Sequence, residues 1–423
     1  MKIGVTGPFC DNNFGDYAML VNDIMDICEN LNEKIDDIVL FCYDGTFLKK
    51  IKEHYLQNYP VSLYEVRTHD SNKEVLAKSD KFVISYKKEN ATPMEIVSQM
   101  ENIEELKQQV AKIEIMILAG GGCINYYWLA EHRRNKLFSI LAPLIVARNE
   151  NKKLVSMGNT FGPWGENEEF FFMLLNYVQF DQINVRDNLF SRPALNKIGI
   201  FNGITDIVDD IYFFNHRFKK QERIVKEKYI LLELYAALND LELLLPDIRD
   251  FVKFMKECYG YRIIFVPFGK GFGGEKQGEY LCEKIPDIAF YKSKEEFLTI
   301  EDAVALISNA EFVLCDRYHA FVLALAANVP CIQYLRQIDE SRQYYYNKCC
   351  GMLRKLRDNC DKTRKIYEKN FFVTELKALF IADKIKLDNT IHAQKNMYTY
   401  EKQKVEKELK ASRLEFITSE LCL

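Results

Sequence analysis

Short apolar runs alternate with segments of helical periodicity over most of the chain. The first run, 2–6, precedes a segment at 15–30 in which apolar residues recur at the spacing of one helix face. Strands alternating with helices favour a parallel, doubly wound sheet. The chain is therefore predicted to be an α/β protein. The other strands of this first series are expected at 37–43, 81–85, 113–119, 153–157, 182–185 and 204–208.

A second series of the same kind follows a charged segment at 217–228, which lacks apolar periodicity and is predicted to be a linker. Because an ordinary domain has about 100 to 200 residues, we predict two α/β domains, 1–216 and 229–360. Residues 361–423 are highly charged and are predicted to form a helical extension that packs back over the first domain or joins a second subunit. Strands of the second series are expected at 229–234, 261–267, 288–291, 312–315 and 330–333.

The charges are nearly balanced, which argues against a broad basic surface. Lys and Arg number 57 against 61 Asp and Glu, a net charge of -4, so no nucleic-acid partner is expected. The first residues lack the pattern of a signal peptide, and no run approaches the roughly 18 apolar residues of a membrane span. Scattered Cys in apolar runs suit a reducing compartment. We expect a cytoplasmic protein, peripheral at a membrane at most.

No metal site is predicted from the 12 Cys of the chain. The only local cluster is Cys349, Cys350 and Cys360, which lacks the paired CxxC spacing of zinc sites.

The loop between the first strand and the first helix contains Asn13, Gly15 and Asp16. Free N–H groups and the positive dipole end of a helix attract anions, so this loop is a candidate for binding phosphate or carboxylate. Asp16 fits equally well as a cap or first-turn acid of the helix, which is the commoner use of Asp there.

Consecutive glycines at 120–122 end a buried strand and permit close approach of backbone or ligand, so Gly121 and Gly122 are candidate binding residues. A close-packed turn explains them at least as well. Their spacing matches neither GxGxxG nor a P-loop, which gives no support to a dinucleotide or ATP site. Asn125 and Asn159 lie at two such strand ends and offer hydrogen bonds to a substrate or to the local turn.

Two Arg residues and a His follow predicted strands. Arg186 ends the strand at 182–185, where it can clamp a carboxylate or phosphate, while Asp187 is expected to cap the next helix. A structural Arg186–Asp187 pair is the alternative. Arg317, Tyr318 and His319 follow the strand at 312–315 within one turn, and a cation beside an imidazole suits an anionic substrate.

These motifs, taken in order, resemble the polysaccharide pyruvyl transferase family. The resemblance implies two Rossmann-like domains arranged as in GT-B glycosyltransferases. It also implies that Arg186, Arg317 and His319 bind phosphoenolpyruvate, the donor substrate, and that no cofactor is needed. The matching segments are Asn13–Asp16, Gly120–Gly122, Gly162-Pro163, Arg186-Asp187 with Ser191, and Arg317–His319.

One later segment departs from the family pattern. Where members often have a Tyr-x-x-Lys-like segment, this chain has Tyr-Leu-Arg-Gln-Ile at 334–338, so Arg336 is the candidate for the missing cation.

The implied reaction moves a pyruvyl group from phosphoenolpyruvate to a pair of sugar hydroxyls in surface polysaccharide or glycan biosynthesis, with a glycan, nucleotide-sugar or lipid-linked acceptor. Arg317 and His319 are the predicted catalytic residues. His319 either protonates the methylene carbon or only hydrogen-bonds the phosphate, in which case an Asp or Glu is the acid. Two other functions fit the sequence: a GT-B-like glycosyltransferase using a nucleotide sugar, and a non-catalytic partner in polysaccharide assembly.

Overall fold

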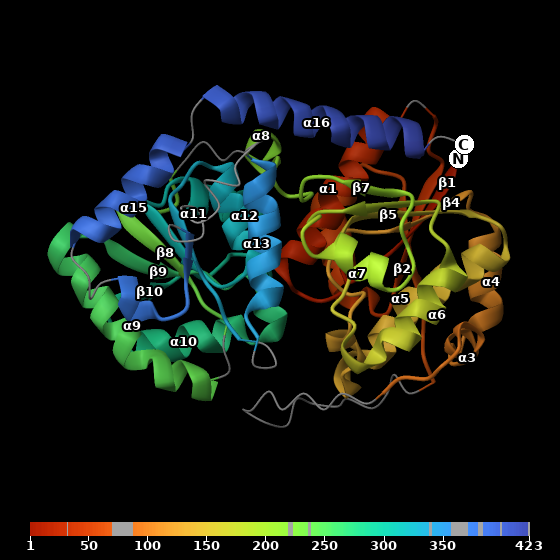
Figure 1. Cartoon of the computed structure of the whole chain (residues 1–423), viewed down its shortest axis with the longest axis horizontal. Helices are drawn as coiled ribbons and strands as arrows, with labels where there is room; N and C mark the ends of the chain where they lie inside the picture. Colours follow the sequence, from red (N-terminus) through yellow and green to blue (C-terminus); the bar gives the residue numbers. More distant parts are fainter. Residues whose placement is uncertain are drawn as a thin grey trace.

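Two parallel β-sheets, each flanked by helices, make up the protein in the computed structural model (Figure 1). The first sheet has the strand order β3-β2-β1-β4-β5-β6-β7 and the second the order β10-β9-β8-β11-β12-β13. These orders are doubly wound, as predicted. The structure describes residues 1–31, 33–69, 88–218, 223–235, 238–337, 341–356, 371–379, 384–397 and 400–421.

The first domain consists of the first sheet and its helices. Its strands are β1 (Lys2–Thr6), β2 (Asp37–Cys42), β3 (Val61–Glu65), β4 (Ile115–Leu118), β5 (Lys153–Asn159), β6 (Gln182–Val185) and β7 (Ile204–Asp206). Its helices are α1 (Phe14–Asn30), α2 (Gly45–Ile51), α3 (Pro93–Ser98), α4 (Ile103–Ala111), α5 (Glu131–Asn149), α6 (Glu168–Val178) and α7 (Ser191–Lys197). The short helix α8 (Phe214–Arg217) follows and contacts helices of the second domain.

One strand of the first sheet was not predicted. β3 pairs with β2 at the sheet edge, and most of its side chains are only half-buried, so it lacks the continuous apolar run of a central strand. The strand predicted at 81–85 lies outside the described residues.

The second domain consists of the second sheet and its helices, and its first five strands lie where they were predicted. Its strands are β8 (Tyr229–Glu233), β9 (Arg262–Phe265), β10 (Ile288–Phe290), β11 (Phe312–Cys315), β12 (Cys331–Tyr334) and β13 (Phe372–Val373). Its helices are α9 (Leu238–Tyr259), α10 (Gly274–Lys284), α11 (Ile300–Ser308), α12 (Tyr318–Ala326), α13 (Gln343–Lys355) and α15 (Lys384–Met397).

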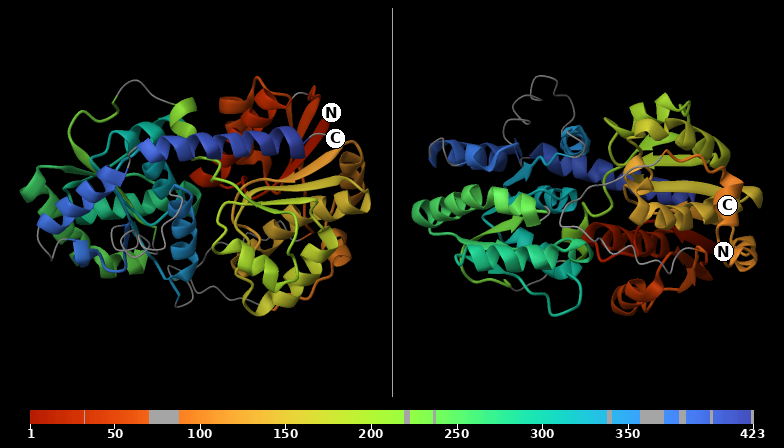
Figure 2. Two further views of the ribbon diagram at one scale, coloured as in Figure 1. Left: turned by 45° about the horizontal axis from the view of Figure 1, so that its top comes forward. Right: turned by 90° about the horizontal axis from the view of Figure 1, so that it is seen from below.

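The C-terminal region is helical at α15 and α16 (Tyr400–Glu420), as predicted, but it also supplies the edge strand β13 to the second sheet. α16 crosses from the second domain back to the first, where it lies beside α1 (Figure 2). There Arg413 pairs with Asp23 at 2.8 Å and with Asp26 at 2.7 Å, and it also pairs with Asp210. Of the two placements predicted for the extension, the structure shows packing over the first domain.

The two domains pack directly against each other through aromatic residues at the start of α1. The Phe14 ring meets the Phe268 ring edge-on at 5.0 Å, and the Tyr17 ring meets Phe297 at 5.8 Å. The Tyr17 hydroxyl donates a hydrogen bond to the Leu298 carbonyl across the same contact. This buried contact fixes the loop before α1 at the boundary between the domains.

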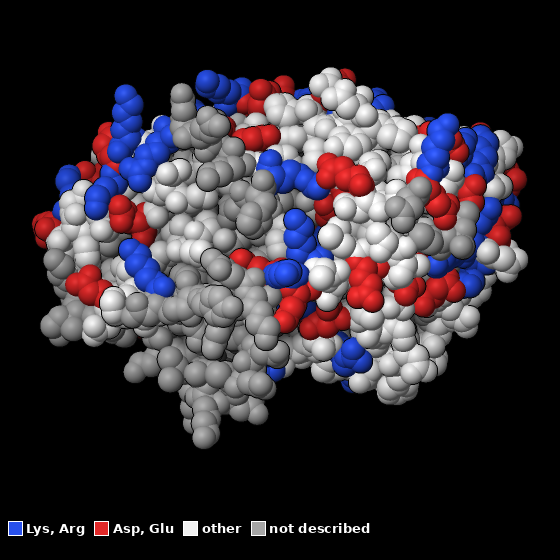
Figure 3. All heavy atoms as spheres, turned by 90° about the horizontal axis from the view of Figure 1, so that it is seen from above, with Lys and Arg blue, Asp and Glu red and all other residues white. Residues whose placement is uncertain are grey.

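On the face shown in Figure 3, acidic and basic side chains are intermixed over both domains. Within the described part of the chain, every helix is too short or too polar to cross a lipid bilayer.

Candidate active site

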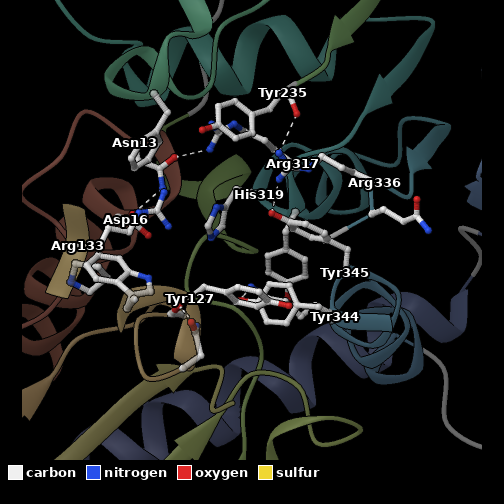
Figure 4. A pocket seen from close by; sticks show the side chains of 18 of the residues that line it. Asn13, Asp16, Tyr127, Arg133, Tyr235, Arg317, His319, Arg336, Tyr344 and Tyr345 are labelled. Carbon is white, nitrogen blue, oxygen red and sulfur yellow. Dashed lines mark hydrogen bonds between the residues drawn. The ribbon is translucent and has the colours of Figure 1, made fainter. Parts of the chain in front are cut away.

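A cavity of about 370 Å³ lies between the two domains, with residues from both in its lining (Figure 4). Its walls come largely from loops and helix starts that follow parallel strands, the usual ligand-binding edge of such sheets. The first domain contributes Pro8, Asn13, Asp16, Gly122, Asn125, Tyr127, Trp128, His132, Arg133 and Arg186. The second contributes Tyr235, Asp240, Phe272, Arg317, Tyr318, His319, Arg336, Gln337, Tyr344, Tyr345 and Lys348.

Most of the residues proposed from the sequence meet in this one cavity, although they come from distant parts of the chain. Those that line it are Asn13, Asp16, Gly122, Asn125, Arg186, Arg317, Tyr318, His319 and Arg336. Gly15, Gly121 and Asn159 lie behind the lining and shape it.

Arg186 is buried at the end of β6 and is held by a carboxylate from another strand end. Its Nη1 lies 2.9 Å from Asp209 Oδ2, and its Nε donates to Thr160 Oγ1 at 3.0 Å. Asp187 accepts hydrogen bonds from Thr160 Oγ1 at 2.7 Å and from the Ser191 N–H at the start of α7 at 3.1 Å. Arg186 therefore pairs with Asp209 and not with Asp187 as the sequence alternative had it. Asp187 binds the first N–H of α7, but the N-cap position itself is Phe190.

His319 lies between the two domains, with its ring resting on Gly15. A Cβ added at Gly15 would lie 1.8 Å from His319 Nδ1, so this approach requires glycine. His319 Nε2 is 3.2 Å from Arg186 Nη1, and a guanidinium can only donate. Nε2 therefore accepts this bond, which places the ring proton of a neutral imidazole on Nδ1.

The surroundings of His319 favour the neutral ring. Burial lowers the His319 pKa well below its ordinary value, and the charges of Arg186, Lys348 and Arg317 lower it further. Of the two roles considered from the sequence, this environment favours hydrogen bonding to an anion over acid catalysis near neutral pH.

Arg317 joins the two domains at the other side of His319. Its Nη1 donates to Asn13 Oδ1 at 2.9 Å, and its Nε lies 3.3 Å from Glu233 Oε1. The guanidinium lies over the Tyr235 ring at 4.1 Å, and among the described residues its buried Nη2 has no hydrogen-bond partner. Burial and the nearby Asp316 raise the Glu233 pKa to about 8, which leaves the positive charge of Arg317 incompletely balanced near neutral pH.

Asp16 lies in the first turn of α1, as predicted, but another side chain is its hydrogen-bond donor. Asn13 Nδ2 donates to Asp16 Oδ2 at 2.6 Å. Burial raises the Asp16 pKa to about 6, although the Asn13 hydrogen bond and Arg186 oppose the shift. Asp16 is thus a cavity carboxyl that can hold a proton at mildly acid pH.

Arg336, the predicted replacement for a cation of the family, is hydrogen-bonded to two tyrosines of the cavity lining. Its Nη1 donates to the Tyr235 carbonyl at 3.0 Å and its Nη2 to Tyr345 Oη at 2.7 Å. Its guanidinium lies over the Tyr235 ring at 4.8 Å, so Arg317 and Arg336 share this ring.

Lys348 was missed by the sequence reasoning. It lies on α13, is only 5% exposed, and Nζ is 3.3 Å from Tyr344 Oη. Burial and the neighbouring charge of Arg186 together lower the Lys348 pKa to about 7. The signal in the sequence was the position of Lys348 beside Cys349 and Cys350, which continue the buried face of the helix.

The glycines and amides around the cations have mainly structural roles. A Cβ at Gly122 would lie 3.1 Å from Tyr344 Oη, which is a tight contact, and at ordinary contact distance from Lys348 Nζ and Arg186 Nη2. Gly121 packs against Pro8, and Asn159 Nδ2 donates to the Leu118 carbonyl at 3.1 Å. Asn125 Nδ2 donates to the Gly122 carbonyl at 2.6 Å.

An aromatic rim, consisting of Tyr127, Trp128, Phe272, Tyr344 and Tyr345, surrounds the rest of the cavity. Arg133 of α5 lies over Trp128 at 5.7 Å and over Phe272 at 5.4 Å, and so bridges the two domains at this rim. None of these aromatic residues was among the site residues predicted from the sequence.

Known structures share the fold of this chain. UDP-GlcNAc 2-epimerase from Methanocaldococcus jannaschii is 16% identical with a TM-score of 0.55, covering 98% of this chain and 99% of that one. Anabaena HepE in complex with UDP and glucose is 11% identical with a TM-score of 0.56, covering 99% of both chains. A Rickettsia africae glycosyltransferase is 10% identical with a TM-score of 0.53, covering 98% of both. The predicted GT-B-like arrangement is confirmed.

At such identities these structures show the fold alone. The comparison with curated proteins returned no significant match. The family model for polysaccharide pyruvyl transferases matches residues 13–335, which include Arg186, Arg317 and His319 of the cavity. The chain therefore belongs to the polysaccharide pyruvyl transferase family.

Proposed function

We propose that this protein transfers the pyruvyl group of phosphoenolpyruvate to two hydroxyls of one sugar, forming a cyclic ketal during synthesis of a surface polysaccharide or related glycan. One observation carries the proposal: the cavity gathers four cationic side chains, two buried and two partly buried, whose positive charge its carboxylates balance only in part. They are Arg186, Arg317, Arg336 and Lys348.

These cations form two pairs that suit the two anionic groups of phosphoenolpyruvate. Arg186 and Lys348 lie together beside Gly122, and Arg317 and Arg336 share the Tyr235 ring. Planar guanidinium groups bind carboxylate and phosphate well because each can donate two parallel hydrogen bonds. We propose that one pair holds the phosphate and the other the carboxylate, with neutral His319 as a further hydrogen-bonding group.

This arrangement supports catalysis by positioning and electrostatics. Addition of a proton to the methylene carbon makes C2 of the donor electrophilic, so that a sugar hydroxyl can attack it. The cations favour the later departure of phosphate because they stabilise the charge that develops on its oxygens. Holding donor and acceptor in one cavity replaces a collision in solution by a reaction between oriented groups.

The acceptor is proposed to bind at the aromatic rim. Ligand pockets combine apolar and aromatic walls with a few polar groups that fix orientation. A sugar ring placed against Tyr127, Tyr344 or Trp128 would present its hydroxyls to the cationic half of the cavity. We propose that this sugar belongs to a glycan, a nucleotide sugar or a lipid-linked saccharide.

The test is release of inorganic phosphate from phosphoenolpyruvate across a panel of nucleotide sugars and lipid-linked oligosaccharides, with mass spectrometry of the products. We expect wild-type protein to give an acceptor carrying a ketal-linked pyruvyl group. Arg317→Ala should lose this activity, whereas Arg249→Ala, on the exposed surface of α9, should retain it. Saturable binding of a nucleotide sugar without any phosphate release would instead support a glycosyltransferase.

A further inference from the structure

The proposed reaction requires an acid that can reach the methylene carbon of the donor. His319 fits this role poorly, because Arg186 Nη1 donates to its Nε2 and three cationic side chains surround the ring. Among the described residues, the carboxyl groups that line the cavity are Asp16 and Asp240.

Only one of these carboxyls lies close to the cations. Asp240 is exposed in the first turn of α9. Asp16 lies in the first turn of α1 and neighbours Gly15, on which the His319 ring rests. Figure 4 shows Asp16 and Asn13 on one side of His319, facing into the cavity.

The hydrogen bonds around Asp16 connect it to the anion-binding groups and leave one oxygen for a substrate. Asn13 bridges Asp16 and Arg317, because its Nδ2 donates to Asp16 Oδ2 and its Oδ1 accepts from Arg317 Nη1. This bridge fixes the carboxyl relative to one of the cations proposed to bind the donor. Within the described residues, Asp16 Oδ1 receives no side-chain hydrogen bond.

We propose that Asp16 is the catalytic acid that protonates the methylene carbon of phosphoenolpyruvate, and that its carboxylate later receives a proton from the acceptor. This inference rests on the proposed function and adds a residue with a defined role to it.

Asp16 alone can supply the proton of this reaction and recover it. The carboxyl proton goes to C3, the C2–C3 π pair forms the new C–H bond, and the first sugar hydroxyl attacks C2. The C2–O bond to phosphate then breaks, and phosphate leaves with the proton of that first hydroxyl. The second hydroxyl attacks C2 and gives its proton to the Asp16 carboxylate, which restores the acid for the next turnover.

The charges facing Asp16 set its titration. Burial raises the Asp16 pKa most, and Asp11 raises it further. The Asn13 hydrogen bond, Arg186 and Arg317 lower it, and the net pKa is about 6. Tyr43 and Cys123 also face it. A bound trianionic donor would raise this pKa further, because a negative charge nearby disfavours the carboxylate. Turnover should therefore fall as pH rises through the pKa of Asp16 in the complex.

The decisive variant is Asp16→Asn, which keeps an oxygen for Asn13 but cannot act as the acid. We expect kcat for phosphate release to fall about 10²- to 10⁴-fold, the usual contribution of a general acid. The dissociation constant of phosphoenolpyruvate, measured by calorimetry, should change less than about threefold, and the melting temperature should confirm folding. Asp16→Glu should restore part of kcat and the pH dependence.

Asp11→Asn is the matched control, because this substitution also removes one negative charge from the loop before α1. The Asp11 carboxylate pairs with Lys136 at 2.8 Å and has no proposed part in the reaction. The control variant should keep kcat and shift the limb of the pH profile to lower pH. A wild-type-like kcat in Asp16→Asn would overturn this proposal and leave the proposed pyruvyl transfer intact. Loss of donor binding in this variant would also overturn it, because Asp16 would then bind phosphoenolpyruvate and not protonate it. No phosphate release by wild-type protein would refute both.

Discussion

The Nδ1 atom of His319 lies where a side chain on Gly15 would have to be, 1.8 Å from the position of an added Cβ. A helix start in the first domain therefore sets the position of an imidazole from the second. The contact also lies next to Asp16, so the positions of His319 and of the proposed catalytic acid both depend on the backbone at the start of α1.

Gly15→Ala should displace His319 and weaken catalysis. We expect kcat/KM to fall about 100-fold, since misplacement by about 1 Å can cost that much. Gly260→Ala is the control: it strains a residue at φ 68° by about 1 kcal/mol, but its Cβ would meet nothing within 4 Å. Steady-state kinetics and thermal melting separate the two effects, and an active Gly15→Ala protein would show that His319 tolerates displacement.

Lys348→Met should weaken donor binding and yet stabilise the fold. Its ammonium is buried beside Arg186 without a carboxylate partner among the described residues, so its removal relieves an electrostatic cost. The folded-state pKa is lowered to about 7, so the folded protein binds fewer protons than the unfolded chain between that value and the ordinary Lys pKa. The free energy of unfolding of the wild-type protein should therefore increase as pH rises above about 7, where Lys348 loses its proton. The Met variant should be stabilised most, relative to wild type, below pH 7.

Two measurements check this prediction. The KM for phosphoenolpyruvate should rise about 10- to 100-fold, the value of a charge-assisted hydrogen bond. Chemical unfolding at pH 6 and pH 9 should show the larger stabilisation at pH 6. Lys355→Met is the contrasting variant: Lys355 is also buried but pairs with Asp206, so its loss should destabilise the protein. Equal stability changes for both variants would contradict the argument.

Arg413→Met should release the C-terminal helix. Arg413 bonds Asp23, Asp26 and Asp210, and removing one partner of a buried ion network costs about 3–5 kcal/mol. Burial raises the Asp210 pKa to about 6 even with Arg413 present, so the variant should be least destabilised at low pH, where the carboxyls are protonated. Urea unfolding across pH measures this loss; Thr418→Ala, farther along α16, is the control.

The same variant tests whether the extension matters to the site. Asp210 directly follows Asp209, whose carboxylate holds Arg186 in the cavity. If this link positions Arg186, Arg413→Met should also raise the KM for phosphoenolpyruvate under conditions where the protein remains folded. An unchanged KM would confine the role of Arg413 to stability.

The sequence predicted the parts of this protein that follow from local chemistry. Buried strands such as β4 and β11 are continuous apolar runs, and the polar groups at their ends, including Arg317 and His319, follow from strand ends meeting at one sheet edge. The half-exposed β3 and the short β13 carry no such signal, since each gains its place by pairing with a neighbour.

The partners within the site could not be predicted in this way. The ion pair of Arg186 with Asp209 and the contact of Gly15 with His319 join segments far apart in sequence. Lys348 was missed because a charged residue on a helix is usually solvated, and only the tertiary packing of α13 against the first domain buries it.

Arg133→Ala should weaken acceptor binding without affecting the donor. Its guanidinium spans Trp128 of the first domain and Phe272 of the second, and within the described residues it forms no ion pair. Loss of a cation–π contact of about 1 to 2 kcal/mol should raise the acceptor KM about tenfold. Arg133→Lys should be intermediate, because an ammonium lacks the planar face that stacks on both rings. The KM for phosphoenolpyruvate should stay within about twofold; a parallel rise in both constants would mean that Arg133 holds the domains together rather than the sugar.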